Sequence, residues 1–297
     1  MPNSLAIIGA GRVGRALGRR MRELGWKIGA VVSRDAVSAR KAVRFIGAGQ
    51  AHAVAVREIL ASRVILVSVP DDAVAQVAGE LARIGAEELR GKIVLHTSGA
   101  LDASALGALK SCGAAVGGMH PLQTFSGVGV PPLEGKIFAI EGDAAAVRTA
   151  RKIVRLLGGS PVRVAGNKKV LYHAAAAMAA GHALAVEETA TQLLISIGMT
   201  RGQAVRALLP LTRQVLENFE HLGPRAAWTG PLSRGDYHVV ESHLMALQAA
   251  PPEFAAAYDV INRLSARVFA RHAAGMIAEL EKISVEKKVK TAAGGNA

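Results

Sequence analysis

Three glycines near the N-terminus have a spacing that could bind phosphate. Gly9, Gly11 and Gly14 directly follow the apolar run Leu5–Ile8 and open a stretch with helical periodicity. In such a turn the first glycine permits a tight bend, the second lets the backbone approach a pyrophosphate, and the third lets helix and strand pack closely. The phosphates meet free N–H groups at the positive end of the helix. The motif predicts a dinucleotide site; a purely structural turn is the alternative. The residues assigned to it are Gly9, Gly11, Arg12, Val13 and Gly14.

The end of the next predicted strand decides which dinucleotide fits. Ser33, Arg34 and Asp35 follow Val31-Val32 there. The Ser33 hydroxyl and the Arg34 guanidinium suit the 2′-phosphate of NADP, through charge-assisted hydrogen bonds. In the alternative, Arg34 is a solvated charge and Asp35 accepts hydrogen bonds from the ribose of NAD. We expect NADP(H).

Two further segments leave predicted strands at the same edge of the sheet. Val69 and Pro70 end one strand, and the two aspartates that follow are expected to cap a helix. Thr97 and Ser98 leave another strand directly after His96. Because ligands bind at the carboxyl ends of strands in open α/β sheets, we expect these four residues to contact the cofactor.

A histidine follows on the cofactor side of the sheet. His120 precedes Pro121, and Gln123 comes three residues later as a candidate substrate contact. An imidazole with an unperturbed pKa near ~6.5 suits proton exchange at neutral pH. In the alternative, His120 bonds the backbone and holds the turn at Pro121.

The first helix of the second half also carries candidate catalytic groups. Lys169, Tyr172 and His173 have i, i+3 and i+4 spacing and share one face. Together they could bind a substrate carboxylate or donate a proton to a reduced carbonyl or imine. In the alternative, Tyr172 and His173 pack against the first domain while Lys169 is solvated.

A later loop holds an arginine and an acid between glycines and a proline. Arg234 and Asp236 lie in the segment Trp228–Asp236. They are candidate substrate contacts, or simply an ion pair that caps the next helix.

The periodicity of the chain predicts an α/β architecture, a doubly wound Rossmann domain followed by an all-helical C-terminal domain. Strands are expected at 5–9, 28–33, 64–69, 93–96, 115–119, 137–140 and 162–164. Helices are expected between them at 12–24, 36–45, 72–84, 104–110 and 144–157. Beyond 166 we expect helices at 168–197, 201–222, 236–247 and 252–283, the last broken near Arg271, with a loop at 223–235. The predicted domains are 1–165, 166–284 and a disordered tail at 285–297.

Composition narrows the class of protein. The net charge is +13, yet no base-reading motif is present, so nucleic acid is an unlikely partner. Cys112 is the single cysteine, and no Cys/His cluster has zinc spacing, so we expect no disulfide and no metal. The least polar stretch, Ala174–Val186, is too short and too interrupted to span a membrane. Without a leader-like N-terminus, we expect a cytoplasmic protein.

Five ordered motifs, spread over about residues 5 to 270, resemble one family. They are Gly9–Gly14, His96–Leu101, His120–Phe125, Lys169 with Tyr172–Ala175, and Thr229–Leu232 with Arg234–Asp236. The chain resembles the Rossmann-like proteins whose C-terminal half is the domain of unknown function 2520. That family is related to pyrroline-carboxylate reductase, prephenate dehydrogenase and 6-phosphogluconate dehydrogenase.

The resemblance implies NADP binding, an all-helical second domain, a cleft between the domains, and a homodimer. His120-Pro121 is similar to a His-Pro element of prephenate dehydrogenases. Lys169 and His173 stand where hydroxyacid dehydrogenases carry a lysine and an asparagine, and because His173 replaces that asparagine, their substrate class is not carried over to this chain. We therefore expect hydride transfer between NADP(H) and a small carbonyl, imine, or hydroxy or amino acid. A non-catalytic NADP(H) sensor or adaptor is the alternative.

Overall fold

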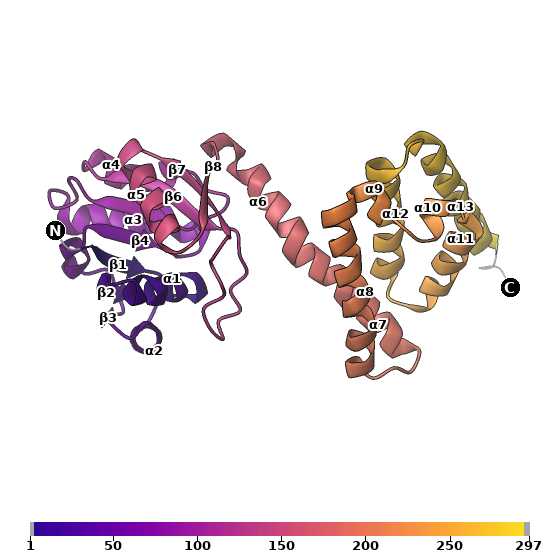
Figure 1. The fold of residues 1–297 in the computed structure, drawn as a ribbon, viewed down its shortest axis with the longest axis horizontal. Helices are drawn as coiled ribbons and strands as arrows, with labels where there is room; N and C mark the ends of the chain where they lie inside the picture. The colour runs from indigo at the N-terminus through magenta and orange to yellow at the C-terminus, as the bar shows by residue number, and fades with distance from the viewer. Residues whose placement is uncertain (1–2, 294–297) are drawn as a thin grey trace. The chain divides into compact units, whose positions relative to one another are not determined.

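The first half of the chain is an eight-stranded sheet with helices on both faces (Figure 1). This computed structural model describes residues 3–293. The strands are β1 Ser4–Ile8, β2 Lys27–Val32, β3 Gln50–His52, β4 Val64–Val67, β5 Ile93–His96, β6 Ala115–Pro121, β7 Ile137–Gly142 and β8 Ser160–Arg163. They lie in the order β3-β2-β1-β4-β5-β6-β7-β8, and only the β6–β7 pair is antiparallel. The first six have the order of the dinucleotide-binding fold, so the predicted fold class is confirmed.

Helices bury both faces of this sheet. They are α1 Arg12–Glu23, α2 Ala36–Ile46, α3 Asp71–Gly85, α4 Gly107–Ser111 and α5 Ala144–Leu156. In β1, Leu5 and Ile7 join the core beneath α1, α2 and α5, whereas Ala6 and Ile8 join the core beneath α3 and α4. A strand covered on both faces is apolar at every position, which is why these strands were recognisable as continuous apolar runs.

Two expectations for this half differ from the structure. The edge strand β3 was not predicted, because Gln50-Ala51-His52 is short and has no β-branched residue. The helix expected at 104–110 is a 3-10 turn, Ala103–Leu106, followed by the short α4. Neither difference moves the edge of the sheet that carries the predicted site residues.

The described residues after β8 form helices and loops without a strand, as predicted. The helices are α6 Lys169–Ala177, α7 Ala183–Ser196, α8 Arg201–Leu222, α9 Pro224–Ala227, α10 Pro231–Arg234, α11 Tyr237–Ala246, α12 Pro252–Phe269 and α13 Ala273–Ala293. A π-helical turn, Met178–His182, joins α6 to α7. The break predicted near Arg271 is present between α12 and α13.

Two expectations for the C-terminal half need correction. The segment expected to be a loop at 223–235 contains α9 and α10, each started by a proline at its first position, where the fixed φ favours a helix. The tail expected to be disordered from 285 continues α13 to Ala293, because its Lys, Glu and Ala residues favour helix. The remainder of that tail, 294–297, lies outside the described residues.

The chain divides into two compact units between Gly181 and His182, within the π-helical turn. Lys169, Tyr172 and His173 therefore belong to the same unit as the sheet. The second unit has its own small apolar core, formed by α10 to α13. Among the described residues, we find no helix with both the length and the apolar character needed to cross a membrane.

Candidate active site

The glycine turn after β1 has the geometry that its sequence predicts. Gly9 has a positive φ of 84°, and a Cβ there would lie 2.4 Å from the Ser68 carbonyl oxygen. A Cβ on Gly14 would lie 2.5 Å from the Gly9 carbonyl oxygen, so helix and strand are in close contact. A Cβ on Gly11, in contrast, would meet no described atom within 4 Å. The turn is therefore tight at its two ends and open at its centre, beside the first N–H groups of α1.

This turn lies at the switch point of the sheet. β1 pairs with β2 on one side and with β4 on the other, so the chain leaves β1 where the strand order reverses. Arg12 is exposed and Val13 half-buried at the start of α1. Arg15, one turn further along, donates a hydrogen bond of 2.6 Å to the Gly127 carbonyl in the loop between β6 and β7. That loop therefore contacts the helix that starts at the turn.

Of the residues after β2, one caps the next helix and two are open to a ligand. The Asp35 carboxylate caps α2, accepting hydrogen bonds from the Ser38 N–H and hydroxyl, both at 2.7 Å. These bonds hold the pKa of Asp35 below its usual value. The Arg34 side chain is 90% exposed, with its Nε 3.6 Å from Asp35. The capping bonds occupy Asp35, whereas the guanidinium of Arg34 and the half-buried Ser33 are available to a ligand.

The segments after β4 and β5 are bonded to each other. The Thr97 hydroxyl donates to the Ser68 hydroxyl at 3.0 Å, and the Ser98 hydroxyl donates to Asp71 at 2.9 Å. Ser98 also accepts hydrogen bonds from two following N–H groups, so it fixes its own turn. The expected aspartate cap is absent from α3, whose N-cap is Pro70 with no side-chain bond; Asp71 instead binds Ser98.

A second constellation lies at the ends of β5 and β6, beside α6. The Nδ1 of His120 lies 3.0 Å from the Tyr172 hydroxyl, and the His120 and His173 rings pack edge to face with centroids 5.6 Å apart. A Cβ on Gly99 would lie 2.4 Å from His173 Nδ1 and 2.9 Å from His120 Nε2. Only a residue without a side chain at position 99 leaves room for both imidazoles.

These groups line a cavity of about 500 Å³ within the first unit. Besides His120, Tyr172 and His173, its walls include Gln123 and the small side chains of Ala175 to Ala177 on α6. Gln123 donates to the Pro132 carbonyl at 3.0 Å, which fixes the loop after β6. A cavity with alanine walls and three convergent polar side chains has the make-up of a small-molecule site.

Lys169 does not line that cavity. Its side chain is fully buried, and its ammonium donates to the Ser98 carbonyl at 2.8 Å. A Cβ on Gly118 would lie 2.8 Å from Lys169 Nζ and 2.6 Å from Glu141 Oε1. Glu141 in turn accepts from the Ala103 N–H at 3.1 Å. The lysine ammonium and the Glu141 carboxylate therefore both lie beside Gly118, and Glu141 Oε1 is also 3.7 Å from His96 Nε2.

Burial and the lysine charge control titration in this region. Burial raises the pKa of Glu141 and lowers that of Lys169. Burial, and secondarily the charge of Lys169, lowers the pKa of His96 to about 3. Burial, and then His173 and Lys169, lowers the pKa of His120 to about 4. Burial raises the pKa of Tyr172. At neutral pH His120 is thus uncharged and Tyr172 keeps its proton.

The free energy of unfolding of the first unit is expected to fall as the pH is lowered from 6.5 to about 5. The folded pKa values of His96 and His120 lie below the unfolded value near ~6.5, so the unfolded state binds more protons in this range. The slope should reach at most ~1.4 kcal/mol per pH unit for each histidine.

Urea unfolding followed by the fluorescence of the buried Trp26, in a Trp228→Phe background, measures this slope for the first unit. His120→Asn keeps a polar group near Nδ1 but does not titrate, so about half of the slope should disappear. A slope equal to that of the parent protein would show that His120 is not buried as a neutral ring.

Sequence reasoning missed several groups that shape the site. Glu141 was not selected, although an acid in an otherwise apolar strand such as Ile137–Gly142 is an available signal. Ser68 and Asp71 were also missed as bonding partners of Thr97 and Ser98. Arg234 and Asp236, selected as substrate contacts, lie in the second unit and pair with each other at 2.9 Å. For this pair, a role in substrate binding stays a prediction.

The strand order and the open glycine turn define the class, a Rossmann-fold protein with a dinucleotide-type turn and with a cavity at the end of β6 in the same unit. Residues 2–121 match the family "Rossmann-like domain", and residues 136–264 match "Domain of unknown function (DUF2520)". The chain therefore contains a Rossmann-like domain followed by a DUF2520 domain. No curated protein sequence gave a significant match.

Solved structures resemble the chain over most of its length. Protein BF3122 from Bacteroides fragilis, described as a proposed NADP oxidoreductase, is 23% identical, with 89% of this chain and 98% of that one covered and a TM-score of 0.72. Protein TM1727 from Thermotoga maritima is 24% identical, with coverages of 91% and 98% and a TM-score of 0.67. A reductive aminase from Aspergillus terreus, in complex with NADPH and ethyl-5-oxohexanoate, is 18% identical, with coverages of 98% and 95% and a TM-score of 0.63. At these identities the similarity establishes the fold.

Proposed function

We propose that this protein is an NADP(H)-dependent oxidoreductase that acts on a small carbonyl or imine, or on the corresponding hydroxy or amino acid. One observation carries the proposal: the open glycine turn and the cavity of His120, Tyr172 and His173 belong to the same unit, at the same edge of one sheet. The names of two similar structures, a proposed NADP oxidoreductase and a reductive aminase with NADPH, support the same chemistry.

The residues of the turn fit a dinucleotide. The open space at Gly11 lets a pyrophosphate approach the first N–H groups of α1, which no side chain caps. Val69, Pro70, Thr97 and Ser98 follow the neighbouring strands and are the proposed contacts for the nicotinamide half. When bound, the cofactor supplies or accepts the hydride.

Ser33 and Arg34 are the proposed ligands of the 2′-phosphate. Arg34→Gln should weaken NADPH binding about tenfold, because one charge-assisted hydrogen bond is lost, and leave the weaker NADH binding unchanged. Calorimetry with both cofactors measures the effect. Arg44→Gln removes an exposed charge near the other end of α2 and is the matched control. An equal loss for NADPH and NADH, or in the control, would rule out recognition of the phosphate by Arg34.

Within the cavity we assign the proton to the pair of Tyr172 and His120. Tyr172 keeps its proton because burial raises its pKa, and the neutral His120 lies within hydrogen-bond distance of the phenol. The phenol can therefore donate to a substrate oxygen or nitrogen while the imidazole exchanges the proton with it. His173 and Gln123 are the proposed substrate contacts. Lys169 positions the Ser98 turn, and its charge adds to the effect of burial, which is the main cause of the lowered pKa values of His96 and His120.

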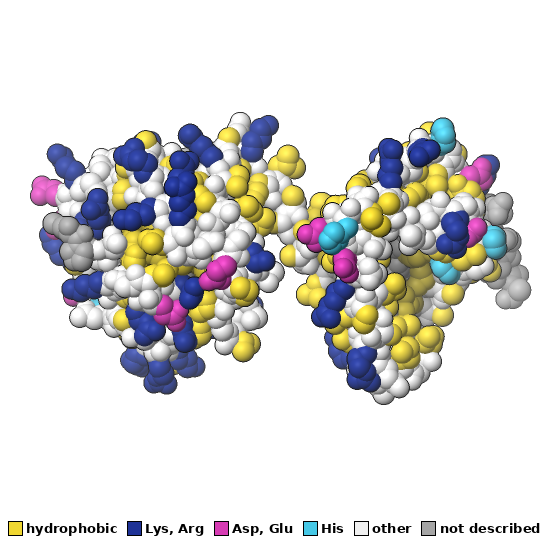
Figure 2. Space-filling view, in the orientation of Figure 1, with side chains coloured by type: hydrophobic (Ala, Val, Ile, Leu, Met, Phe, Trp, Pro, Cys, Tyr) yellow, Lys and Arg dark blue, Asp and Glu magenta, His cyan; other side chains and the backbone are white. Residues whose placement is uncertain are grey.

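A homodimer is part of the proposal. The helices α7 and α8, described along their full length, bury only Thr191 and Ala204. Large apolar side chains are exposed along one side of α8, at Leu211, Val215, Leu216, Phe219 and Leu222. Figure 2 shows apolar side chains exposed on the second unit. Patches of this kind mark protein interfaces, and a second copy presents a matching α8.

Sedimentation tests the dimer. The protein should sediment at twice the mass of one chain, and Leu211→Glu with Phe219→Glu should give monomers. Arg213→Glu, which places an acid at an exposed position of α8 between them, is the control and should stay dimeric. A monomeric parent protein would contradict this part of the proposal.

Turnover tests the function as a whole. NADPH oxidation should be detectable with at least one compound of a panel of small ketones, aldehydes and 2-oxo acids, each assayed with and without ammonia or methylamine. Tight NADPH binding with no turnover across the panel would favour the non-catalytic sensor. Absence of NADPH binding would overturn both functions.

A further inference from the structure

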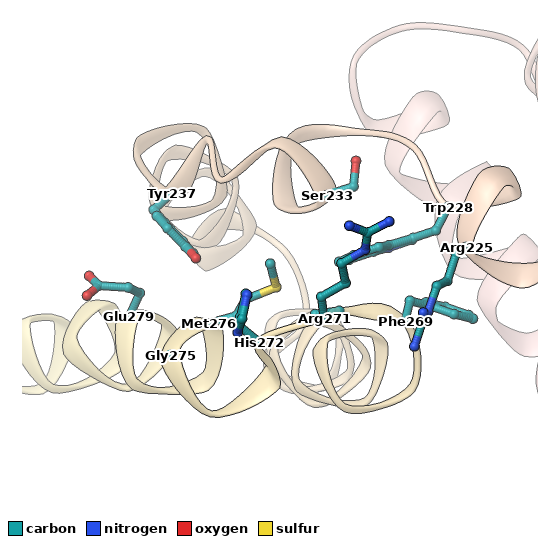
Figure 3. A pocket seen from close by; sticks show the side chains of 11 residues that line it. Arg225, Trp228, Ser233, Tyr237, Phe269, Arg271, His272, Gly275, Met276 and Glu279 are labelled. Atoms are coloured by element: carbon teal, nitrogen blue, oxygen red, sulfur yellow. The ribbon is translucent and has the colours of Figure 1, made fainter.

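The second unit contains a pocket that the proposed reaction does not use. It has a volume of about 670 Å³ and lies between the segment from α9 to α11 and the junction of α12 with α13 (Figure 3). The side chains that line it include Arg225, Trp228, Ser233, Tyr237, Phe269 and Arg271. Every residue of the lining belongs to the second unit.

The charges in this pocket favour an anion. Arg225 and Arg271 are exposed, and among the described side chains neither has an acid within ion-pair distance. The single acid of the lining, Glu279, is paired with Lys282 at 2.6 Å. In Figure 3, Arg271 extends into the pocket from the junction of α12 and α13, and Arg225 projects from the opposite side, near Phe269. Two guanidinium groups are thus left for a ligand.

The start of α13 adds positive partial charge to the same pocket. This helix has 21 residues and begins at Ala273, directly after Arg271 and His272. The first N–H groups of a helix have no partner within the helix and carry its positive partial charge. Gly275, in this first turn, belongs to the lining, and a Cβ there would meet no described atom within 4 Å. The pocket is therefore open where the helix begins.

Aromatic rings form another part of the wall. Trp228 and Phe269 pack with ring centroids 5.6 Å apart and planes 37° apart. Trp228, Tyr237 and Met276 also pack against the buried core of the second unit, which holds them in place. A fixed indole beside a phenyl ring offers a flat apolar surface next to the two arginines.

We propose that this pocket binds a small organic anion with a flat ring, an aryl phosphate or aryl carboxylate. The anionic group binds Arg225, Arg271 and the start of α13. The ring lies against Trp228 and Phe269. The Tyr237 hydroxyl is available to polar substituents, and Ser233, whose hydroxyl donates to the Gly230 carbonyl at 2.8 Å, can only accept. The volume is within the range of pockets that hold small ligands.

Fluorescence of Trp228 gives a direct readout. The protein has two tryptophans, and Trp26 is buried in the first unit, so Trp26→Phe leaves Trp228 as the reporter. Phenyl phosphate is the probe. Inorganic phosphate, which has the anionic group alone, and benzyl alcohol, which has the ring without the charge, are the comparison ligands. Phenyl phosphate should change the emission with an affinity at least tenfold above that of either comparison ligand, because it uses both the charges and the rings.

Single substitutions test which residues of the pocket bind the probe. The variants Arg225→Gln and Arg271→Gln should each weaken the binding of phenyl phosphate about tenfold, as expected when one charge-assisted hydrogen bond is lost. Arg213→Gln, which removes an exposed charge from α8 outside the pocket, should change the affinity less than twofold. Gly275→Leu fills the open space without altering charge and should abolish binding, which keeps the test decisive if an arginine variant fails to fold.

Four results would overturn the proposal. They are equal affinity for phosphate and phenyl phosphate, an effect of Arg213→Gln as large as that of Arg271→Gln, full binding by Gly275→Leu, and displacement of the probe by saturating NADPH. The last result would assign the pocket to the dinucleotide. Because no outcome depends on turnover, failure here is separate from failure of the proposed reaction.

Discussion

Tyr172→Phe is expected to lower kcat/KM for the carbonyl or imine substrate by about 10²- to 10⁴-fold, the usual contribution of a positioned proton donor. The loss should fall on kcat, because the phenol that His120 holds at 3.0 Å is removed while the walls of the cavity stay in place. The Kd for NADPH should change less than twofold, since Tyr172 lies outside the glycine turn. Steady-state kinetics and calorimetry on the same preparation measure both quantities.

The chain provides a matched control for this variant. The Tyr258 hydroxyl lies 2.7 Å from His243 Nδ1, so the second unit contains a similar pair of phenol and imidazole. Tyr258→Phe deletes the same oxygen and should leave kcat within about twofold of the parent protein. If Tyr172→Phe also turned over at the parental rate, His120 or His173 would have to donate the proton, and the assignment to Tyr172 would be wrong.

Lys169→Met is expected to lower the free energy of unfolding of the first unit by about 3 kcal/mol, the size of loss expected when a buried charge is left without a compensating charge. The ammonium is fully buried and bonded to Ser98, and its charge favours the ionised form of Glu141. Without it, the carboxylate and the Ser98 carbonyl lose a buried positive partner. Urea unfolding is followed by the fluorescence of Trp26 in a protein with Trp228 replaced by Phe, so that the signal reports on the first unit alone.

Two companion variants make this measurement specific. Lys168→Met deletes the neighbouring exposed ammonium and should cost less than about 0.5 kcal/mol, as for most surface substitutions. Lys169→Met combined with Glu141→Gln should be more stable than Lys169→Met alone, because no buried charge is left without its partner. A double variant no more stable than the single one would show that lysine and glutamate do not interact.

The contrast between Lys169 and Tyr172 shows how far a helical pattern predicts a site. The spacing places both on one face of α6, and both do face the sheet. The pattern does not say how deep each side chain lies. Gly118 leaves a space in β6 that admits the lysine ammonium and Glu141, whereas the phenol stays at the level of His120. The lysine ammonium therefore lies buried against the Ser98 carbonyl, and the tyrosine reaches the cavity.

Features that depend on local backbone conformation and on periodicity could be predicted from the amino-acid sequence. The glycine turn at Gly9 to Gly14 follows from steric limits within six residues, and its tight ends and open centre are as expected. Apolar runs in β1 and β4 predicted strands buried on both faces, and helical periodicity predicted the C-terminal half. The same reasoning missed β3, because a short polar edge strand depends on its neighbour for its conformation.

Contacts between residues far apart in the chain could not be predicted in this way, because they depend on the packing of whole elements. His120 and Tyr172 are 52 positions apart, and Lys169 bonds Ser98 across 71 positions. The pocket of the second unit joins Arg225 to Arg271 through the packing of α9 to α13. Such contacts depend on how helices and strands pack against one another and on which side chains lose water when they do. Burial then determines which histidine is uncharged and which lysine is inaccessible to solvent. The spacing of residues along the chain does not predict either property.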